Sequence, residues 1–187
     1  FPAPVNTVVP MYTIHSEVAT LPDSYREKGV QEVSFKIAFD PDFVAKVKFL
    51  RDLGLASHDP VSIGGTTVRP IDVANHVAMN QRPARRIGPL RQYEIVRAIV
   101  KATAGHTKQT WVVHLHTKGM PAWGIGLDID TGSPPAVAAQ MLAAGEITDR
   151  GALPPERAVP WKPFFARLKP RGMRVVATKK PGWSFAV

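Results

Sequence analysis

The sequence contains no cysteine, which excludes disulfide bonds, thiolate metal ligands and a cysteine nucleophile. It also has no run approaching the roughly 18 apolar residues that a membrane-spanning helix needs, so we expect no membrane span. The opening FPAPVNTVVP has neither the positive charge nor the long apolar run of a signal peptide, and its first residue is not Met. We interpret the chain as a piece of a longer protein whose earlier part is missing.

The composition is that of a folded domain. Of 187 residues, 44% are hydrophobic and 21% charged, which suits a single domain, residues 1–187, with a real core. The net charge is +9. The basic residues are spread along the chain and do not alternate with aromatic residues. We therefore interpret them as a solvated basic surface and expect no nucleic-acid partner, although net charge alone leaves that alternative open.

One strand–helix unit has consistent signals along its whole length. Residues 32–39 alternate polar and apolar side chains, which predicts a half-buried strand. Asp40 is a good N-cap and Pro41 suits the first helical position. Apolar residues at helical spacing then continue to Leu53, and Gly54 ends the run. The pattern predicts a helix from Pro41 to about Leu53.

The remaining patterns predict a mixture of hairpins and helices. They indicate a short hairpin or loop at 59–68, a hairpin at 92–117 and a strand or strand-loop at 123–129. They also indicate helices at 70–79, 131–145 and 161–168, and a last strand at 173–178. This order indicates an α+β fold with a mixed, largely antiparallel sheet. We expect the helices to pack mainly on one face, and the other face to meet a partner subunit or another domain.

Two segments suggest ligand-binding chemistry without establishing it. Gly124 and Gly126 begin a dinucleotide-like pattern, but the third glycine is replaced by Ile129, so we expect this chain alone to bind no cofactor. Thr131 and Gly132 are predicted at a helix N-terminus, where free N–H groups can bind an anion such as a substrate carboxylate. Plain capping of the helix is the alternative.

Other polar residues are weaker candidates. His15 and Glu17 follow a short predicted strand and could orient a substrate or carry a proton, or merely tie down a loop. Arg85 lies in a predicted basic loop and is a candidate for binding a carboxylate. His114 and His116 share one face of a predicted strand, but no third ligand stands at a recognised spacing. We expect no metal site and name no catalytic residue.

Five segments carry a family resemblance. They are HSEVATLP (15–22), EVSFKIAFDPDFVAKVKFLRDLGL (32–55), YEIVRAIVKATAG (93–105), DTGSPPAVAAQMLAAGEITDRGALPPE (130–156) and FFARLKPRGMRV (164–175). In their order and spacing, these segments resemble the C-terminal region of the saccharopine dehydrogenase family. The resemblance covers nearly the whole chain.

The resemblance implies a substrate-binding and dimerisation domain whose N-terminal Rossmann domain is missing from this chain. In the full-length protein, NAD or NADP would take hydride from, or give it to, an amino-acid-type amine or imine. The implied protein is a cytoplasmic homodimer, and the isolated chain is expected to be inactive. One departure concerns the substrate, because residues 36–40 stand where several members carry an arginine-tyrosine-proline-glycine motif. A non-catalytic binding or oligomerisation module is the alternative.

Overall fold

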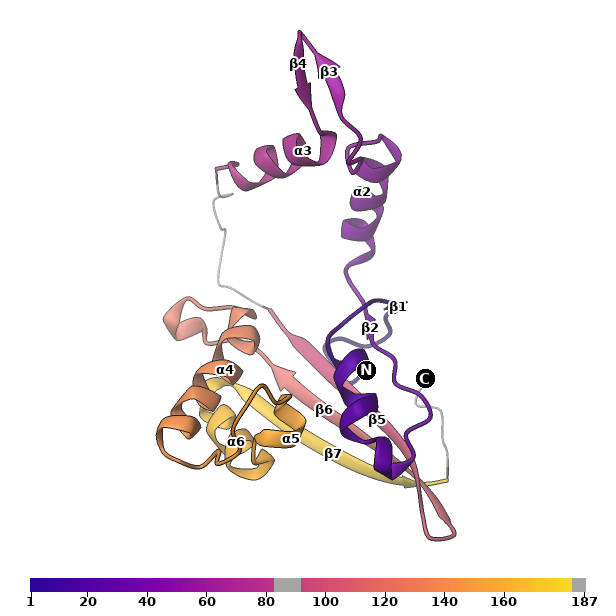
Figure 1. Ribbon diagram of the computed structural model, residues 1–187, viewed down its shortest axis with the longest axis vertical. Helices are drawn as coiled ribbons and strands as arrows, with labels where there is room; N and C mark the ends of the chain where they lie inside the picture. Colours follow the sequence, from indigo (N-terminus) through magenta and orange to yellow (C-terminus); the bar gives the residue numbers. More distant parts are fainter. Residues whose placement is uncertain (83–91, 183–187) are drawn as a thin grey trace. The chain divides into compact units, whose positions relative to one another are not determined.

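The computed structural model describes residues 1–82 and 92–182, which form two compact units. The larger, here called the sheet unit, contains Phe1–Thr7, Ile14–Phe35 and the described residues from 92 onward. The smaller, here called the small unit, contains Val8–Thr13 and residues 36–82. Figure 1 gives the order of the elements along the chain. Each unit is described by itself.

The sheet unit is built on three antiparallel strands in the order β5-β6-β7. These strands are β5 (Glu94–Ala104), β6 (Thr107–Thr117) and β7 (Met173–Pro181). A turn at Gly105 and His106 joins β5 to β6, and Gly105 adopts φ +60°, as the first central residue of a type II′ turn does. The ladder runs without a bulge from Ala104↔Thr107 to Glu94↔Thr117. The register therefore fixes which side chains share a face along the whole hairpin.

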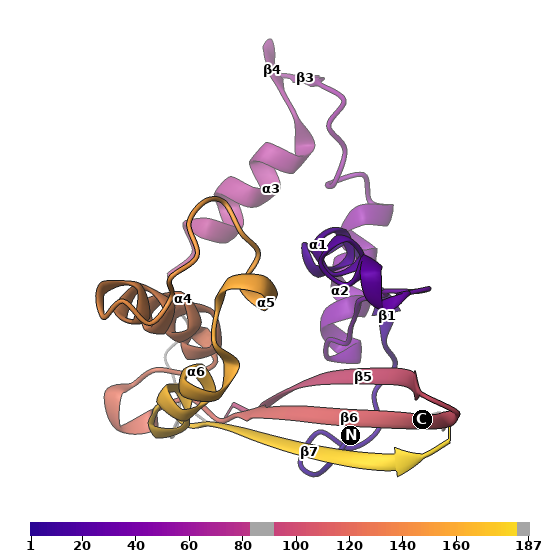
Figure 2. The ribbon, with the colours of Figure 1, turned by 60° about the horizontal axis from the view of Figure 1, so that its bottom comes forward.

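Helices cover one face of this sheet. In Figure 2, α4, α5 and α6 lie on the same side of the three strands. Their buried residues, among them Val137, Met141 and Leu168, form the core with Met173 and the partly buried Leu115. The unit's helical elements are α1 (Glu17–Ser24), η1 (Arg26–Lys28), η2 (Pro121–Trp123), α4 (Asp128–Ala143), α5 (Pro155–Ala158), α6 (Trp161–Leu168) and η3 (Lys169–Arg171).

A close backbone crossing connects the end of β6 with the start of β7. Gly119 has φ +68°, and a Cβ atom there would lie 2.7 Å from the carbonyl oxygen of Gly126. Gly172 has φ +76°, and its Cβ would lie 2.8 Å from the carbonyl oxygen of Gly119. Both positions need glycine twice over, for the left-handed conformation and for the space.

The small unit has two short β-pairs and two helices. Strand β1 (Met11–Tyr12) pairs with β2 (Lys36–Ile37), and β3 (Val61–Ile63) pairs with β4 (Thr66–Val68), both antiparallel. The helices α2 (Pro41–Asp52) and α3 (Pro70–Met79) contain no buried residue. Apolar side chains of α2 remain about half exposed, for example Phe43 at 52% and Phe49 at 61%. No described helix of the chain is long and apolar enough to cross a membrane.

The α+β class, the antiparallel pairing and the helices on one face are confirmed. Helix α2 is confirmed with its cap, since the carboxylate of Asp40 accepts a 3.1 Å hydrogen bond from the backbone N–H of Phe43. The predicted strand at 32–39 is wrong in extent: only Lys36–Ile37 is strand, because its partner β1 is equally short.

Two further predictions near residue 125 are wrong. Residues 123–129 form no strand, because Gly124 adopts φ +66° and an isolated bridge between Met120 and Ile125 closes a tight loop. Helix α4 begins at Asp128, three residues before the predicted start at Thr131. Asp128 and Asp130 occupy its first turn, where carboxylates interact favourably with the helix dipole. Helix α1 was not predicted.

Candidate functional site

Glu94 and Asp130 bring two carboxyl groups together within the sheet unit. Glu94 is the first residue of β5, and Asp130 lies in the first turn of α4. Both residues are partly buried, and the carboxyl group of Asp130 is near enough to that of Glu94 to raise its pKa. A protonated Glu94 can donate a hydrogen bond to a neighbouring carboxylate, which the ionised form cannot.

The surroundings favour the protonated form of Glu94. Burial contributes most, the hydrogen bond to Asp130 next, and the negative charge of Asp130 least; together they raise the pKa of Glu94 from 4.5 to about 7. In the described parts of the chain, no ion pair includes either carboxyl group. Near neutral pH Glu94 is therefore partly ionised beside Asp130, without a described cationic partner.

A buried hydroxyl group lies across the ladder from Glu94. Thr117 is the register partner of Glu94, and opposed residues in an antiparallel pair place their side chains on the same face. Thr117 is 1% exposed, and its Oγ1 has no hydrogen-bond partner. A buried hydroxyl group without a hydrogen-bond partner is costly. The end of the hairpin therefore holds a polar group that lacks a partner, on the sheet face that also carries Glu94.

Two hydrogen bonds hold the start of α4 in place. Gln92, just before β5, accepts a 3.1 Å hydrogen bond at Oε1 from the backbone N–H of Leu127, just before α4. Thr131 donates from Oγ1 to Oδ1 of Asp130 at 3.2 Å. The first bond ties the start of α4 to the beginning of β5, and the second links the carboxyl group of Asp130 to the next residue of the helix. We call Glu94, Asp130 and Thr117 the carboxyl site.

The opposite face of the sheet carries a separate network. Ile95 and His116 follow Glu94 and precede Thr117, so their side chains point to the other face. Tyr93 Oη and His116 Nδ1 are 2.8 Å apart, and Arg97 Nε donates to His114 Nε2 at 2.8 Å. This network cannot share a ligand with the carboxyl site.

The pKa values of both histidines of that network are lowered, which favours their neutral form. Burial is the main cause that lowers the pKa of His114, followed by the charge of Arg97. Burial also lowers the pKa of His116, followed by the charge of Arg174. A neutral ring lets His114 accept from the guanidinium group. No group of three or more His, Asp or Glu side chains in residues 1–82 and 92–182 is placed to hold a metal ion.

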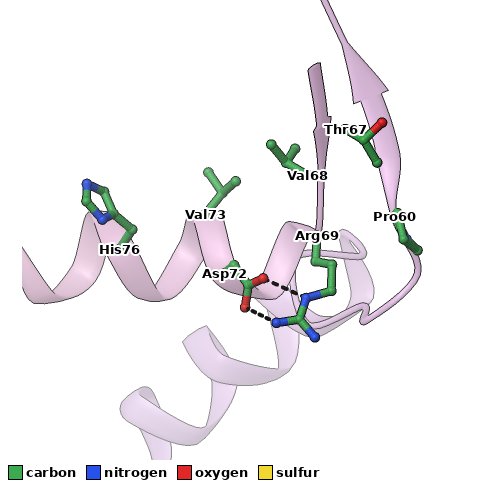
Figure 3. A pocket seen from close by; sticks show the side chains of 7 residues that line it. All are labelled: Pro60, Thr67, Val68, Arg69, Asp72, Val73 and His76. Atoms are coloured by element: carbon green, nitrogen blue, oxygen red, sulfur yellow. Dashed lines mark hydrogen bonds and ion pairs between the residues drawn. The ribbon is translucent and has the colours of Figure 1, made fainter. Parts of the chain in front are cut away.

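The small unit has a hollow of about 550 Å³ beside β4 and α3, shown in Figure 3. Arg69 is paired with Asp72 on its rim through contacts of 2.6 Å from Nε to Oδ2 and 3.0 Å from Nη2 to Oδ1. This bidentate pair uses two of the five guanidinium N–H donors and offsets the charge of Arg69. The other lining residues are Pro60, Thr67, Val68, Val73 and His76, and they form no charged cluster.

The predicted site residues that the structure describes form two separate groups, His15 with Glu17 and Thr131 with Gly132. Nδ1 of His15 contacts Oε2 of Glu17, and the His15 ring stacks on Phe35 with centroids 4.2 Å apart. This geometry suits the tie-down alternative, and a substrate role for either residue stays a prediction. Arg85 lies outside the described residues.

Thr131 and Gly132 lie inside α4, in its second turn, and not at its free end. The unbonded N–H groups belong to the residues before Thr131, beside the carboxylates of Asp128 and Asp130. The premise of the predicted anion contact is therefore wrong, while the substrate role itself stays a prediction. The same carboxylates would repel a pyrophosphate, and every described strand pair is antiparallel. The described residues do not fit a dinucleotide.

Sequence reasoning missed Glu94, Asp130 and Thr117. Glu94 opens a run rich in Ile and Val, where a carboxylate is unusual at the edge of a core-forming strand. Asp130 adjoins the predicted site at Thr131, but its partner lies 36 positions away, and only the fold joins them. The hairpin register could have predicted that Glu94 and Thr117 face each other, had the turn been placed at Gly105 and His106.

A search of curated proteins gives no match to this chain. A comparison with protein-family models gives a match over residues 3–173, to the saccharopine dehydrogenase C-terminal domain. The match spans both units and includes every residue of the carboxyl site. The chain therefore belongs to the saccharopine dehydrogenase C-terminal domain family.

Proposed function

We propose that this chain is the substrate-binding and dimerisation part of an NAD(P)-dependent oxidoreductase that acts on an amino-acid-type amine or imine. The observation that carries the proposal is the family match over residues 3–173. The nicotinamide cofactor would be held by a Rossmann domain outside this chain, because the described residues do not fit a dinucleotide. Residues 1–187 would then act as one domain of a cytoplasmic homodimer, a location and assembly that rest on the family alone.

The chemistry of the carboxyl site supports an amine-type substrate. A substrate amine is positively charged at neutral pH, and the site offers a pair of carboxyl groups with no described cation beside them. Thr131 belongs to the same region through its hydrogen bond to Asp130. His15, Glu17, Arg85 and Gly132 remain candidates for further substrate contacts.

The test begins with the parent gene. The sequence upstream of Phe1 should encode more than about 120 residues, with a G-x-G-x-x-G pattern after a predicted strand. The complete protein should then reduce NAD or NADP when supplied with secondary amines of amino acids, monitored by absorbance of the reduced nicotinamide. A gene without such a domain, or a complete protein with no turnover on any such amine, would refute the oxidoreductase proposal.

A further inference from the structure

We propose that Glu94, Asp130 and Thr117 form a binding site for the primary ammonium group of a small molecule. The inference deepens the proposed function by naming the part of the substrate that this site takes, and it rests on that function for the identity of the natural ligand. Three features carry the inference: the unpaired carboxyl groups, the buried hydroxyl without a partner, and the number of acceptors they present together.

The first feature is the charge of the pair. Burial and mutual repulsion make full ionisation of Glu94 and Asp130 costly, and no ion pair of the described residues relieves it. A bound cation would remove this repulsion, because an opposite charge within hydrogen-bond reach favours the ionised form. Both side chains are partly exposed, so a ligand from solvent can reach them.

The second feature is Thr117. Its side chain is 1% exposed and lies across the β5–β6 ladder from Glu94, on the same face. Oγ1 has no partner, although nearly all buried hydroxyl groups have one. A ligand N–H donor at this end of the strands would satisfy it, once a side-chain movement opens the buried Oγ1 to the ligand. This observation is independent of the carboxyl charges, since it concerns a neutral group.

The third feature separates an ammonium group from other cations. A primary ammonium presents three N–H donors, and the site presents three acceptor side chains. Mg²⁺ and Ca²⁺ need about six or more oxygen ligands, and residues 1–82 and 92–182 hold no cluster of three acidic or imidazole groups suited to a metal. A quaternary ammonium ion has the charge without the N–H donors, which makes it a matched probe.

The experiment titrates the 187-residue chain with n-propylammonium chloride and follows the side-chain carboxyl carbons of Glu94 and Asp130 by NMR. We expect saturable shifts, a lowered pKa of Glu94 with ligand bound, and an association constant that rises between pH 6 and 8 as Glu94 loses its proton. Tetramethylammonium at the same ionic strength should give no saturable shift. The amide spectrum of each variant confirms that it is folded.

The variants separate binding from folding. Glu94→Gln, Asp130→Asn and Thr117→Val should each lower the association constant about tenfold or more, the usual effect of losing a charge-assisted hydrogen bond. Thr117→Ser keeps the hydroxyl and should bind close to wild type. Asp128→Asn is the matched control, because Asp128 lies in the same turn of α4 but is exposed.

Four results would overturn the inference. Equal binding of propylammonium and tetramethylammonium would show a nonspecific charge effect, and tighter binding of Mg²⁺ would show a metal site. An ordinary Glu94 pKa near 4.5 without ligand would show that a cation of the chain already neutralises the pair. Absence of propylammonium binding in a complete protein that oxidises amines would refute this inference and leave the proposed function standing. Propylammonium binding by a protein whose gene encodes no nicotinamide-binding domain would refute the proposed function and leave this inference standing.

Discussion

Removing the charge of Glu94 should stabilise the folded chain at high pH and not at low pH. The pKa of Glu94 is raised from 4.5 to about 7, so the folded state holds this proton more tightly than the unfolded state. Stability is therefore lost as pH rises from about 4.5 to about 7, and the loss is constant above that range. Glu94→Gln removes the titrating group while keeping its size, and should abolish this loss.

The expected magnitude follows from the shift and from the exposure of the side chain. At about 1.4 kcal/mol per pKa unit, a rise from 4.5 to about 7 sets an upper limit of about 3 kcal/mol. Glu94 is only partly buried, and solvent screening reduces such values, so we expect ~1–2 kcal/mol. The quantity to measure is the difference in unfolding free energy between variant and wild type, which should grow by this amount from pH 4 to pH 8.

Urea denaturation followed by circular dichroism at pH 4, 5.5, 7 and 8.5 measures this difference. The histidines act in the opposite direction: the lowered pKa values of His114 and His116 make stability rise with pH up to about 6.5. Their contribution is the same in both proteins and cancels in the difference. Asp128→Asn is the matched control, because Asp128 is an exposed carboxylate in the same turn of α4 as Asp130. A difference that stays constant with pH for Glu94→Gln would refute the reasoning.

Three further changes test the fold by the same denaturation assay. Gly119→Ala should destabilise the fold more than Gly105→Ala. Both glycines have positive φ, which costs about 1 kcal/mol or more for alanine, but only a Cβ at Gly119 would clash with backbone atoms. Equal losses of stability would contradict the close backbone crossing at Gly119. Met141→Ala should cost about 2–5 kcal/mol, because Met141 is 0% exposed in the core and its loss leaves a cavity. Asp40→Ala should lower the free energy of unfolding by about 1 kcal/mol, because it removes the N-cap of α2. The control Asp42→Ala should lower it less, and the reverse order would rule out the cap.

Local signals predicted the elements whose causes are local. Helix α2 has its cap, its first-position proline and its stop within the segment itself, and the prediction agrees with the structure to within a residue or two. Helix α3 likewise starts at Pro70, where proline fits the first turn. These features act over a few residues, so the sequence contains them directly.

The failures arise where distant residues decide the outcome. The alternation at 32–39 gives only Lys36–Ile37, because β1 offers two residues for pairing. Helix α4 begins at Asp128, earlier than predicted, and Gln92 accepts a hydrogen bond from the backbone N–H of Leu127 just before it. The carboxyl site needs β5, β6 and α4 together, so no window of sequence contains it. Of the predicted site residues that the structure describes, Thr131 alone has a described contact with it, the hydrogen bond to Asp130.

The β5–β6 hairpin makes the carboxyl site sensitive to insertions far from it. Glu94 and Thr117 stand at the open end of two 11-residue strands, and the turn at Gly105 and His106 closes the other end. At about 3.4 Å per residue, that turn lies ~35 Å from the site. One residue added in the turn and absorbed by a slip of the ladder would bring a different residue opposite Glu94 and turn Thr117 away from it. The length of the turn would then be under selection for the chemistry at the far end of the strands. A loop grafted at Gly105 should therefore keep the number of turn residues, which matters more than their identity.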